Sequence, residues 1–127
     1  MIEKLKQGSL IAVITGVWGS LHVLTQTLCI LIALDFSTGI LIAWSMKTIC
    51  SDISFRGISK KATMLLLVGA TASYNATQPL GFDAASAVAG FFCTTEFISI
   101  LENASKLGVP LPTVIRLALA KIKSELS

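Results

Sequence analysis

The sequence predicts an all-α integral membrane protein with about four transmembrane helices and a C-terminal amphipathic helix. Of its 127 residues, 54% are hydrophobic and only 13% are charged, and the mean hydropathy is +0.80. A soluble domain is about half apolar and about a quarter charged, so the shortage of charge is the stronger sign of a membrane protein. No long polar linker, internal repeat or low-complexity tract divides the chain, which predicts one domain over residues 1–127.

The most apolar run, residues 28–44, carries one acid near its middle, Asp35. Each leucine, isoleucine or phenylalanine favours insertion by about 0.3 to 0.6 kcal/mol, whereas a central aspartate opposes it by roughly 2.5 to 3.5 kcal/mol. The run can therefore insert, and it gains from neighbours that shelter the acid. Asp35, Gly39 and Ala43 share one helical face, where small residues let another backbone approach closely. We therefore expect a membrane helix that associates with others.

The N-terminal part of the chain is too long for one span. Residues 9–46 contain only His22 and Asp35 as basic or acidic side chains. One helix of that length would extend about 57 Å, far beyond a hydrocarbon core of about 30 Å. We predict two spans with a break between residues 16 and 26, where glycine and polar side chains dilute the apolar run. In a three-span alternative, residues 9–26 would be an interfacial segment.

The remaining elements follow from where polar and turn-forming residues fall. A basic connection is predicted over residues 47–61, and proline and glycine indicate a turn at residues 75–83. Asp83 has the position of an N-cap for the next helix. After two prolines, apolar residues at helical spacing predict an amphipathic helix on the membrane surface. The expected spans are residues 9–24, 27–46, 62–77 and 84–102, and the expected amphipathic helix is residues 113–126.

The positive-inside rule orients this arrangement. Basic residues mark the N-terminus, the 47–61 connection and the C-terminal segment, whereas the 75–83 turn has none. Four spans with both termini in the cytoplasm satisfy all of these markers. Cys50, inside the basic connection, is then expected on the cytoplasmic side.

Acidic residues inside membrane helices are candidate functional residues. Asp35 and Glu96 could hold helices together, handle ions or protons, or line an aqueous path. Ion pairs are expected on the cytoplasmic side, where the third span begins and the fourth ends, among Lys60, Lys61, Glu96 and Glu102. The polar residues expected at a lining or in assembly are Asp35, Ser37, Thr38, Ser73, Thr94, Thr95 and Glu96. The small residues expected in helix packing are Gly39, Ala43, Gly69, Ala85, Ala89 and Gly90.

Several chemical functions lack support in the sequence. The three cysteines show no paired spacing, and His22 has no second metal-type residue at a useful distance. No catalytic triad, nucleophile elbow or phosphate-binding glycine loop is visible, so no catalytic residues, metal or cofactor are expected and the protein is not expected to be an enzyme. Nucleic-acid binding is not expected, because no basic face is interleaved with aromatic residues. The N-terminus lacks a small-x-small cleavage site, so we expect it to be retained.

Four motifs together resemble the toxin-secretion/phage-lysis holin family: Asp35-x-x-x-Gly39, Ser54-x-x-Gly57-x-x-Lys60-Lys61, the block from Glu96 to Asn103, and Leu107-Gly-Val-Pro-x-Pro112. The resemblance covers residues 28 to the end. It implies a non-enzymatic protein of the bacterial cytoplasmic membrane that forms homo-oligomers among membrane lipids and opens lesions. Such lesions release a functionally paired endolysin, or a toxin. The segment from Arg116 onward is less densely charged than many holin tails.

Two other functions remain open at this point. The chain could be a small channel or exporter subunit that passes toxin or ions without lysis, or a scaffold within a larger membrane complex. Neighbouring genes would separate them, since an adjacent amidase or lysozyme favours the holin, a toxin the exporter, and a transporter the scaffold.

Overall fold

The computed structural model describes residues 1–47 and 51–126, and Cys50 lies outside them. All secondary structure in these ranges is helical. The five helices are α1 (Ile2–Ser20), α2 (Val23–Ser45), α3 (Ser51–Thr77), α4 (Ala84–Lys106) and α5 (Thr113–Leu126). The all-α class predicted from the sequence is confirmed.

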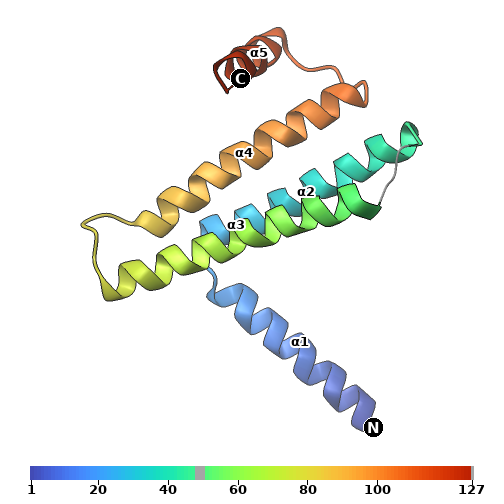
Figure 1. The fold of residues 1–127 in the computed structure, drawn as a ribbon. Coiled ribbons are helices and arrows are strands. Elements are labelled where there is room, and N and C mark those ends of the chain that lie inside the picture. Colours follow the sequence, from blue (N-terminus) through green and yellow to red (C-terminus); the bar gives the residue numbers. More distant parts are fainter. Residues whose placement is uncertain (48–50, 127) are drawn as a thin grey trace.

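Helices α2, α3 and α4 lie alongside one another and form the body of the molecule (Figure 1). The chain runs in the same direction along α2 and α4 and in the opposite direction along α3. Helix α4 packs against both α2 and α3, whereas α2 and α3 make few contacts with each other. The core is small: Leu28, Val68 and Ala89 are buried, one from each helix. Most of the surface of the three helices is therefore not covered by other parts of the chain.

Helix α1 points away from this body (Figure 1). Every residue of α1 is exposed, including large apolar side chains such as Ile11 and Val17. The helix break falls at Leu21 and His22, inside the interval that the sequence indicates. The corner is held by the Gln26 side-chain amide, whose Nε2 donates to the Trp18 carbonyl oxygen at 2.7 Å.

The second helix has a histidine cap that the sequence did not suggest. His22 is the N-cap of α2, and its Nδ1 accepts a hydrogen bond from the Leu24 backbone N–H at 3.2 Å. An N-cap side chain satisfies one of the backbone donors that a helix start leaves without a partner. His22 therefore helps to fix the start of α2.

Helix α3 begins earlier than the polarity of the sequence suggests. The connection predicted over residues 47–61 is helical from Ser51 onward, so the expected third span, residues 62–77, is only the apolar part of a longer helix. Polarity marks where a segment leaves an apolar environment, but it does not end a helix. Residues 51–61 contain one glycine, Gly57, and no proline, and nothing among them breaks the helix.

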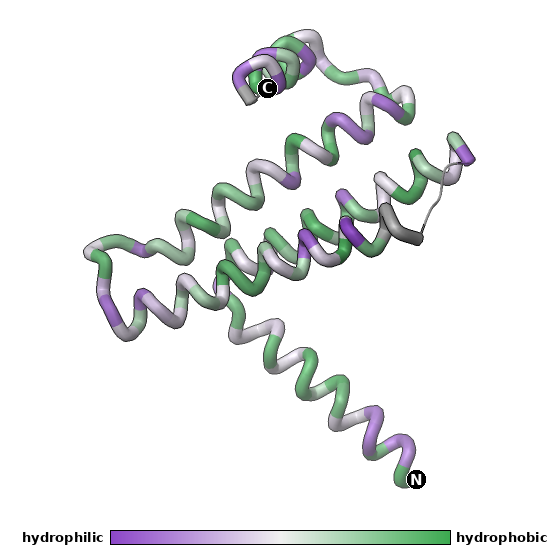
Figure 2. Tube along the Cα trace, in the orientation of Figure 1, coloured by the Kyte–Doolittle hydropathy of each residue, from purple (hydrophilic) through white to green (hydrophobic). Residues whose placement is uncertain are grey.

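Two described helices, α2 and α4, are long and apolar enough to cross a membrane. Figure 2 shows the contrast between these apolar helices and the hydrophilic start of α1. Because α2 and α4 run in the same direction, the chain has to return along α3 from the end of one to the start of the other (Figure 1). If both helices span the bilayer, α3 must cross it too. The four-span count stays a prediction, since α1 stands apart.

The last two helices begin with features that the sequence predicts. Asp83 is the N-cap of α4, and it accepts hydrogen bonds from the Ser86 backbone N–H at 3.1 Å and from the Ser86 hydroxyl at 2.6 Å. Helix α5 covers the residues expected for the amphipathic helix. Figure 1 shows α5 nearly end-on while α4 lies along the picture, so α5 runs across the direction of the bundle. Leu119 is its buried contact residue.

Candidate functional site

The most unusual group of side chains is buried where α2, α3 and α4 meet. The Lys61 ammonium lies 2.7 Å from Asp35 Oδ2 and 2.6 Å from Glu96 Oε2. The exposed side-chain fractions are 14% for Lys61, 10% for Asp35 and 4% for Glu96. Both distances are those of strong charge-assisted hydrogen bonds. One lysine therefore joins two acids from two other helices, and each helix supplies one charge.

An asparagine completes this group. Asn103 Nδ2 donates to Asp35 Oδ1 at 3.0 Å, and it also lies 2.9 Å from Thr38 Oγ1. It further approaches the Asp35 carbonyl oxygen at 3.3 Å. Asn103 thus ties α4 to α2 on the side of Asp35 that Lys61 does not occupy. We call Asp35, Lys61, Glu96 and Asn103 the buried polar cluster.

The three charged residues lie at the same level of the bundle. Asp35 is ten residues before the end of α2, Lys61 is ten residues after the start of α3, and Glu96 is ten residues before the end of α4. Ten residues of α-helix extend about 15 Å, which is about half of a 30 Å hydrocarbon core. In a bilayer the cluster would lie well below the surface, where no water is available to solvate an isolated charge.

Charge balance gives the cluster its energetic significance. A lone Asp or Lys at the centre of a membrane helix costs roughly 2.5 to 3.5 kcal/mol for insertion. Here each charge has a partner within the chain, and no buried side-chain nitrogen or oxygen among the described residues lacks a hydrogen-bond partner. Two carboxylates facing one ammonium leave a formal charge of −1 when both acids are ionised. The buried polar atoms of the cluster therefore all have hydrogen-bond partners, and the pairing of both carboxylates depends on Lys61.

The structure brings together only some of the polar residues named from the sequence. Ser37, Thr94 and Thr95 are exposed, and each hydroxyl donates to the carbonyl oxygen four residues earlier in its own helix. Ser73 is exposed on α3. These four residues lie outside the buried polar cluster, on surfaces that the chain itself does not cover.

Only some of the residues expected in ion pairs lie in the buried polar cluster. Lys60 is exposed and lies next to the lysine that joins the two acids. Glu102 contacts Lys123 of α5 at 3.5 Å. Of the expected set, the structure brings Lys61 and Glu96 together, and it gives Glu102 a partner from the C-terminal helix.

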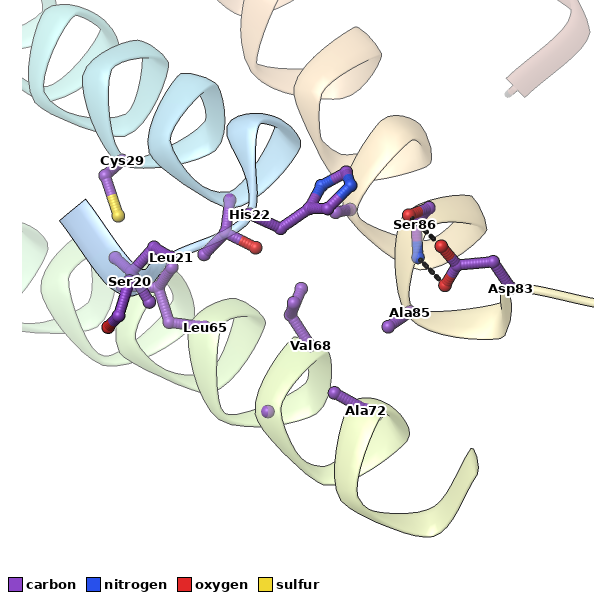
Figure 3. Close-up of a pocket in the computed structure, with 13 residues that line it drawn as sticks. Ser20, Leu21, His22, Cys29, Leu65, Val68, Ala72, Asp83, Ala85 and Ser86 are labelled. Carbon is purple, nitrogen blue, oxygen red and sulfur yellow. Dashed lines mark hydrogen bonds between the residues drawn. The ribbon is translucent and has the colours of Figure 1, made fainter. Parts of the chain in front are cut away.

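The small residues expected in packing surround a hollow at the other end of the bundle. Gly69, Ala85 and Ala89 line a cavity of about 540 Å³ together with the start of α2 (Figure 3). Figure 3 shows His22 and Asp83 at this end, with Asp83 bonded to Ser86. The cavity exists because α2 and α3 scarcely touch.

The glycines are not used for tight packing within the part of the chain that the structure describes. A Cβ atom added at Gly39, Gly69 or Gly90 would meet nothing within 4 Å. Ala89 is buried in the core, whereas Ala43 and Ala85 are half-buried. The glycine positions on α2, α3 and α4 therefore have no close neighbour from another described helix, whereas Ala89 packs in the core.

Asn103 is the cluster residue that the sequence reasoning missed. It entered only as the last residue of a family motif. Its spacing of seven from Glu96 puts both on one helical face, and this was the available signal. Which residue of α2 it meets depends on how α2 and α4 cross, and helical spacing alone does not determine that crossing.

The fold and the site define a helical membrane protein, with apolar helices outside and a charge cluster inside. Residues 12–124 match the bacteriophage holin family. The chain belongs to this family, which is not a family of enzymes.

Individual relatives are similar to this chain over most of its length. An uncharacterised protein of Clostridium perfringens is 34% identical over 112 residues, covering 87% of this chain and 83% of the relative. A second C. perfringens protein, encoded in the nagH 3′ region, is 32% identical over 98% of this chain and 97% of its own length. A probable holin of Bacillus phage phi105 is 29% identical over 72% of this chain and 68% of its own length. No solved structure matches.

Proposed function

We propose that this protein is a working holin: it accumulates in the bacterial cytoplasmic membrane, forms homo-oligomers and opens lesions that release an endolysin or a toxin. The observation that carries the proposal is the match of residues 12–124 to the holin family, over helices of membrane-spanning length. The similarity to a probable phage holin supports the same role. Membrane lipid and further copies of the chain are the partners that this function requires.

The buried polar cluster suggests how the same chain could first accumulate without permeabilising the membrane and later open lesions. In the closed chain, Lys61 pairs with the acids of the two neighbouring helices and holds them inside the bundle, so that the outer surfaces that meet lipid are mostly apolar. Such a chain can accumulate without conducting water or ions. Separation of α3 from α2 and α4 would uncover one ammonium and two carboxylates, which only water or another copy could then solvate.

The same groups would then serve as an aqueous lining. Asp35 and Glu96 would face the lumen after the helices separate, and the exposed hydroxyls of Ser37 and Thr95 would add to a polar wall. In this mechanism the polar residues of the sequence act at two stages. They hold the chain closed first, and they stabilise the open assembly later.

Assembly requires faces that another copy can approach. Helix association in lipid depends on close packing of small residues, because apolar contact with lipid is equally favourable. Gly39, Gly69 and Gly90 have open space where a side chain would be, and α1 is exposed along its whole length. These surfaces are the ones we assign to contacts between copies.

The proposed topology has both termini in the cytoplasm. The end of the bundle that carries the start of α3 and the end of α4 is basic, with Arg56, Lys60 and Lys106, whereas the opposite turn has no lysine or arginine. The positive-inside rule places the basic end in the cytoplasm. The cavity beside His22 would then open toward the outer face.

The test is release of a large cytoplasmic protein. The gene is induced in a bacterium together with an endolysin that has no export signal, and culture density is followed. Lysis that requires both proteins supports a lesion wide enough for an enzyme. If the cells lose ions but the endolysin stays inside, the channel or exporter function applies instead.

A further inference from the structure

A second polar site lies between the end of α4 and the amphipathic helix α5. A hollow of about 310 Å³ is lined by Ser105 and Lys106 from α4 and by Arg116, Leu119 and Lys123 from α5. At roughly 30 Å³ per water molecule, this is the volume of about ten waters, which is more than a bare phosphate group needs. The site lies outside the buried polar cluster, at the basic end of the bundle.

The charges around the hollow favour an anion. Three cationic side chains line it, against one carboxylate, Glu102. Glu102 Oε2 lies 3.5 Å from Lys123 Nζ, so the carboxylate charge is balanced by Lys123. Arg116 is held at the start of α5 by its Nε, which donates to the Leu111 carbonyl oxygen at 3.2 Å. A guanidinium has five N–H donors, so this bond leaves most of them for a ligand.

The surroundings of the hollow favour an anion with an apolar part. Helix α5 runs across the bundle direction, as expected for a helix in the plane of a membrane surface (Figure 1). On α5, Leu117 is 66% exposed and directly follows the lining residue Arg116, so an uncovered apolar side chain lies about 100° around the helix from the hollow. A soluble anion would leave Leu117 uncovered. A phospholipid would place its phosphate at the basic residues and its acyl chains against Leu117.

We propose that the hollow between α4 and α5 binds the headgroup phosphate of an anionic glycerophospholipid. Lys106 and Arg116 contact the phosphate, and Lys123 moves from Glu102 toward it. The bound lipid fixes α5 against α4 at the cytoplasmic surface. This inference rests on the proposed membrane placement of α5, but it does not depend on lesion formation.

The test measures binding of a single lipid to the purified full-length protein. Native mass spectrometry of the protein in a neutral detergent gives the dissociation constant of the first phosphatidylglycerol bound, with zwitterionic phosphatidylcholine, which has no net charge, as the comparison. Phosphatidylglycerol should bind more tightly. Arg116→Gln or Lys106→Gln should weaken its binding about fivefold, which corresponds to about 1 kcal/mol for one basic residue.

Two further variants separate a built site from general attraction to positive charge. Lys121 belongs to α5 but does not line the hollow, so Lys121→Gln should leave the dissociation constant nearly unchanged. Glu102→Gln should tighten binding, because it removes the carboxylate nearest the phosphate. A gain of affinity cannot result from a damaged fold, which makes this variant informative even if the arginine variant unfolds.

The proposal is overturned if phosphatidylglycerol binds no more tightly than phosphatidylcholine, or if Lys121→Gln weakens binding as much as Arg116→Gln. It is equally overturned if Glu102→Gln fails to tighten binding. Glycerol phosphate and inorganic phosphate are added as soluble competitors. Displacement of the lipid by either at equal concentration would show that the site recognises a soluble phosphate, and the lipid assignment would be wrong. Lysis is not measured, so failure here leaves the proposed holin function untouched.

Discussion

Lys61 Nζ lies 2.7 Å from Asp35 Oδ2, although the two residues belong to different helices and are 26 positions apart. The same ammonium holds Glu96 at 2.6 Å. A lysine side chain that would ordinarily extend toward water at the end of a membrane helix is instead directed inward. The closed state of the chain therefore depends on one cation shared by two acids, and this dependence can be tested.

Removal of the shared cation should be the most damaging single change in the cluster. Lys61→Met leaves two buried carboxylates without a cation, and we expect a loss of about 3–5 kcal/mol in the free energy of unfolding, typical of a broken buried ion pair. Asp35→Asn should cost less, because Lys61 keeps Glu96 and their charges balance. Unfolding in mixed micelles with increasing dodecyl sulfate, followed by circular dichroism, measures both.

Lys60→Met is the matched control for this comparison. Lys60 is adjacent in sequence but exposed, so its replacement should change the free energy of unfolding by less than about 0.5 kcal/mol. Equal losses for Lys60→Met and Lys61→Met would show that the ammonium does not stabilise the bundle.

Asn103 should stabilise the contact between α4 and α2. Asn103→Leu removes the donor to Asp35 Oδ1 and to Thr38 Oγ1, and we expect a loss of about 1–3 kcal/mol because a buried carboxylate oxygen loses its partner. Thr38→Val removes only the second acceptor and should cost less. A double-mutant cycle in the same micelle assay gives the coupling between the two residues. A coupling of zero would mean that the 2.9 Å contact contributes nothing.

The topology predicts the labelling of a single thiol. In a Cys29→Ala, Cys93→Ala variant, Cys50 is the remaining cysteine. It is surrounded in the sequence by Lys47, Arg56 and other basic residues, so it should lie in the cytoplasm and resist an impermeant maleimide in intact cells. Permeabilised cells provide the positive control. Labelling of intact cells before any lesion opens would reverse the proposed orientation.

The N-cap of α4 predicts a pH dependence outside the membrane helices. Hydrogen bonds from the Ser86 hydroxyl and backbone lower the pKa of Asp83 below its ordinary value. The cap's contribution is therefore complete above the unfolded carboxyl pKa of about 3.9, and it is lost as the pH falls through the lower folded value. A carbon NMR titration should show the lowered pKa, and Ser86→Ala should raise it. An unchanged pKa in Ser86→Ala would contradict the hydroxyl's role.

The helices were largely predictable because their signals are local. Proline and glycine around residues 75–83 and the position of Asp83 located the start of α4, and glycine with polar side chains located the break before α2. The start of α3 was predicted too late in the sequence, because the polar residues before residue 62 were taken as a connection outside the helix. A helix continues past the apolar region until a residue breaks it, and Ser51 is where α3 actually begins.

The cluster was less predictable because it depends on how three helices are rotated against one another. The apolar surroundings of Asp35 and Glu96 identified them as needing partners, and the position of Lys60 and Lys61 near the same helix ends suggested cations. The choice between the two lysines requires the rotation of α3, and the contact of Asn103 requires the crossing of α2 and α4. Neither quantity is encoded by spacing within a single helix.

The central claim is that chains accumulate closed and then open together. Its most direct test is the membrane potential of single bacteria, recorded with a voltage-sensitive dye after induction of the full-length gene. The proposed assembly through small-residue faces predicts a long interval of normal potential followed by an abrupt, complete collapse. Lys61→Met protein at matched membrane levels should shorten that interval, because its closed state is weaker. A gradual loss of potential that follows protein level from the first minutes, unchanged by Lys61→Met, would contradict the account and identify a simple channel.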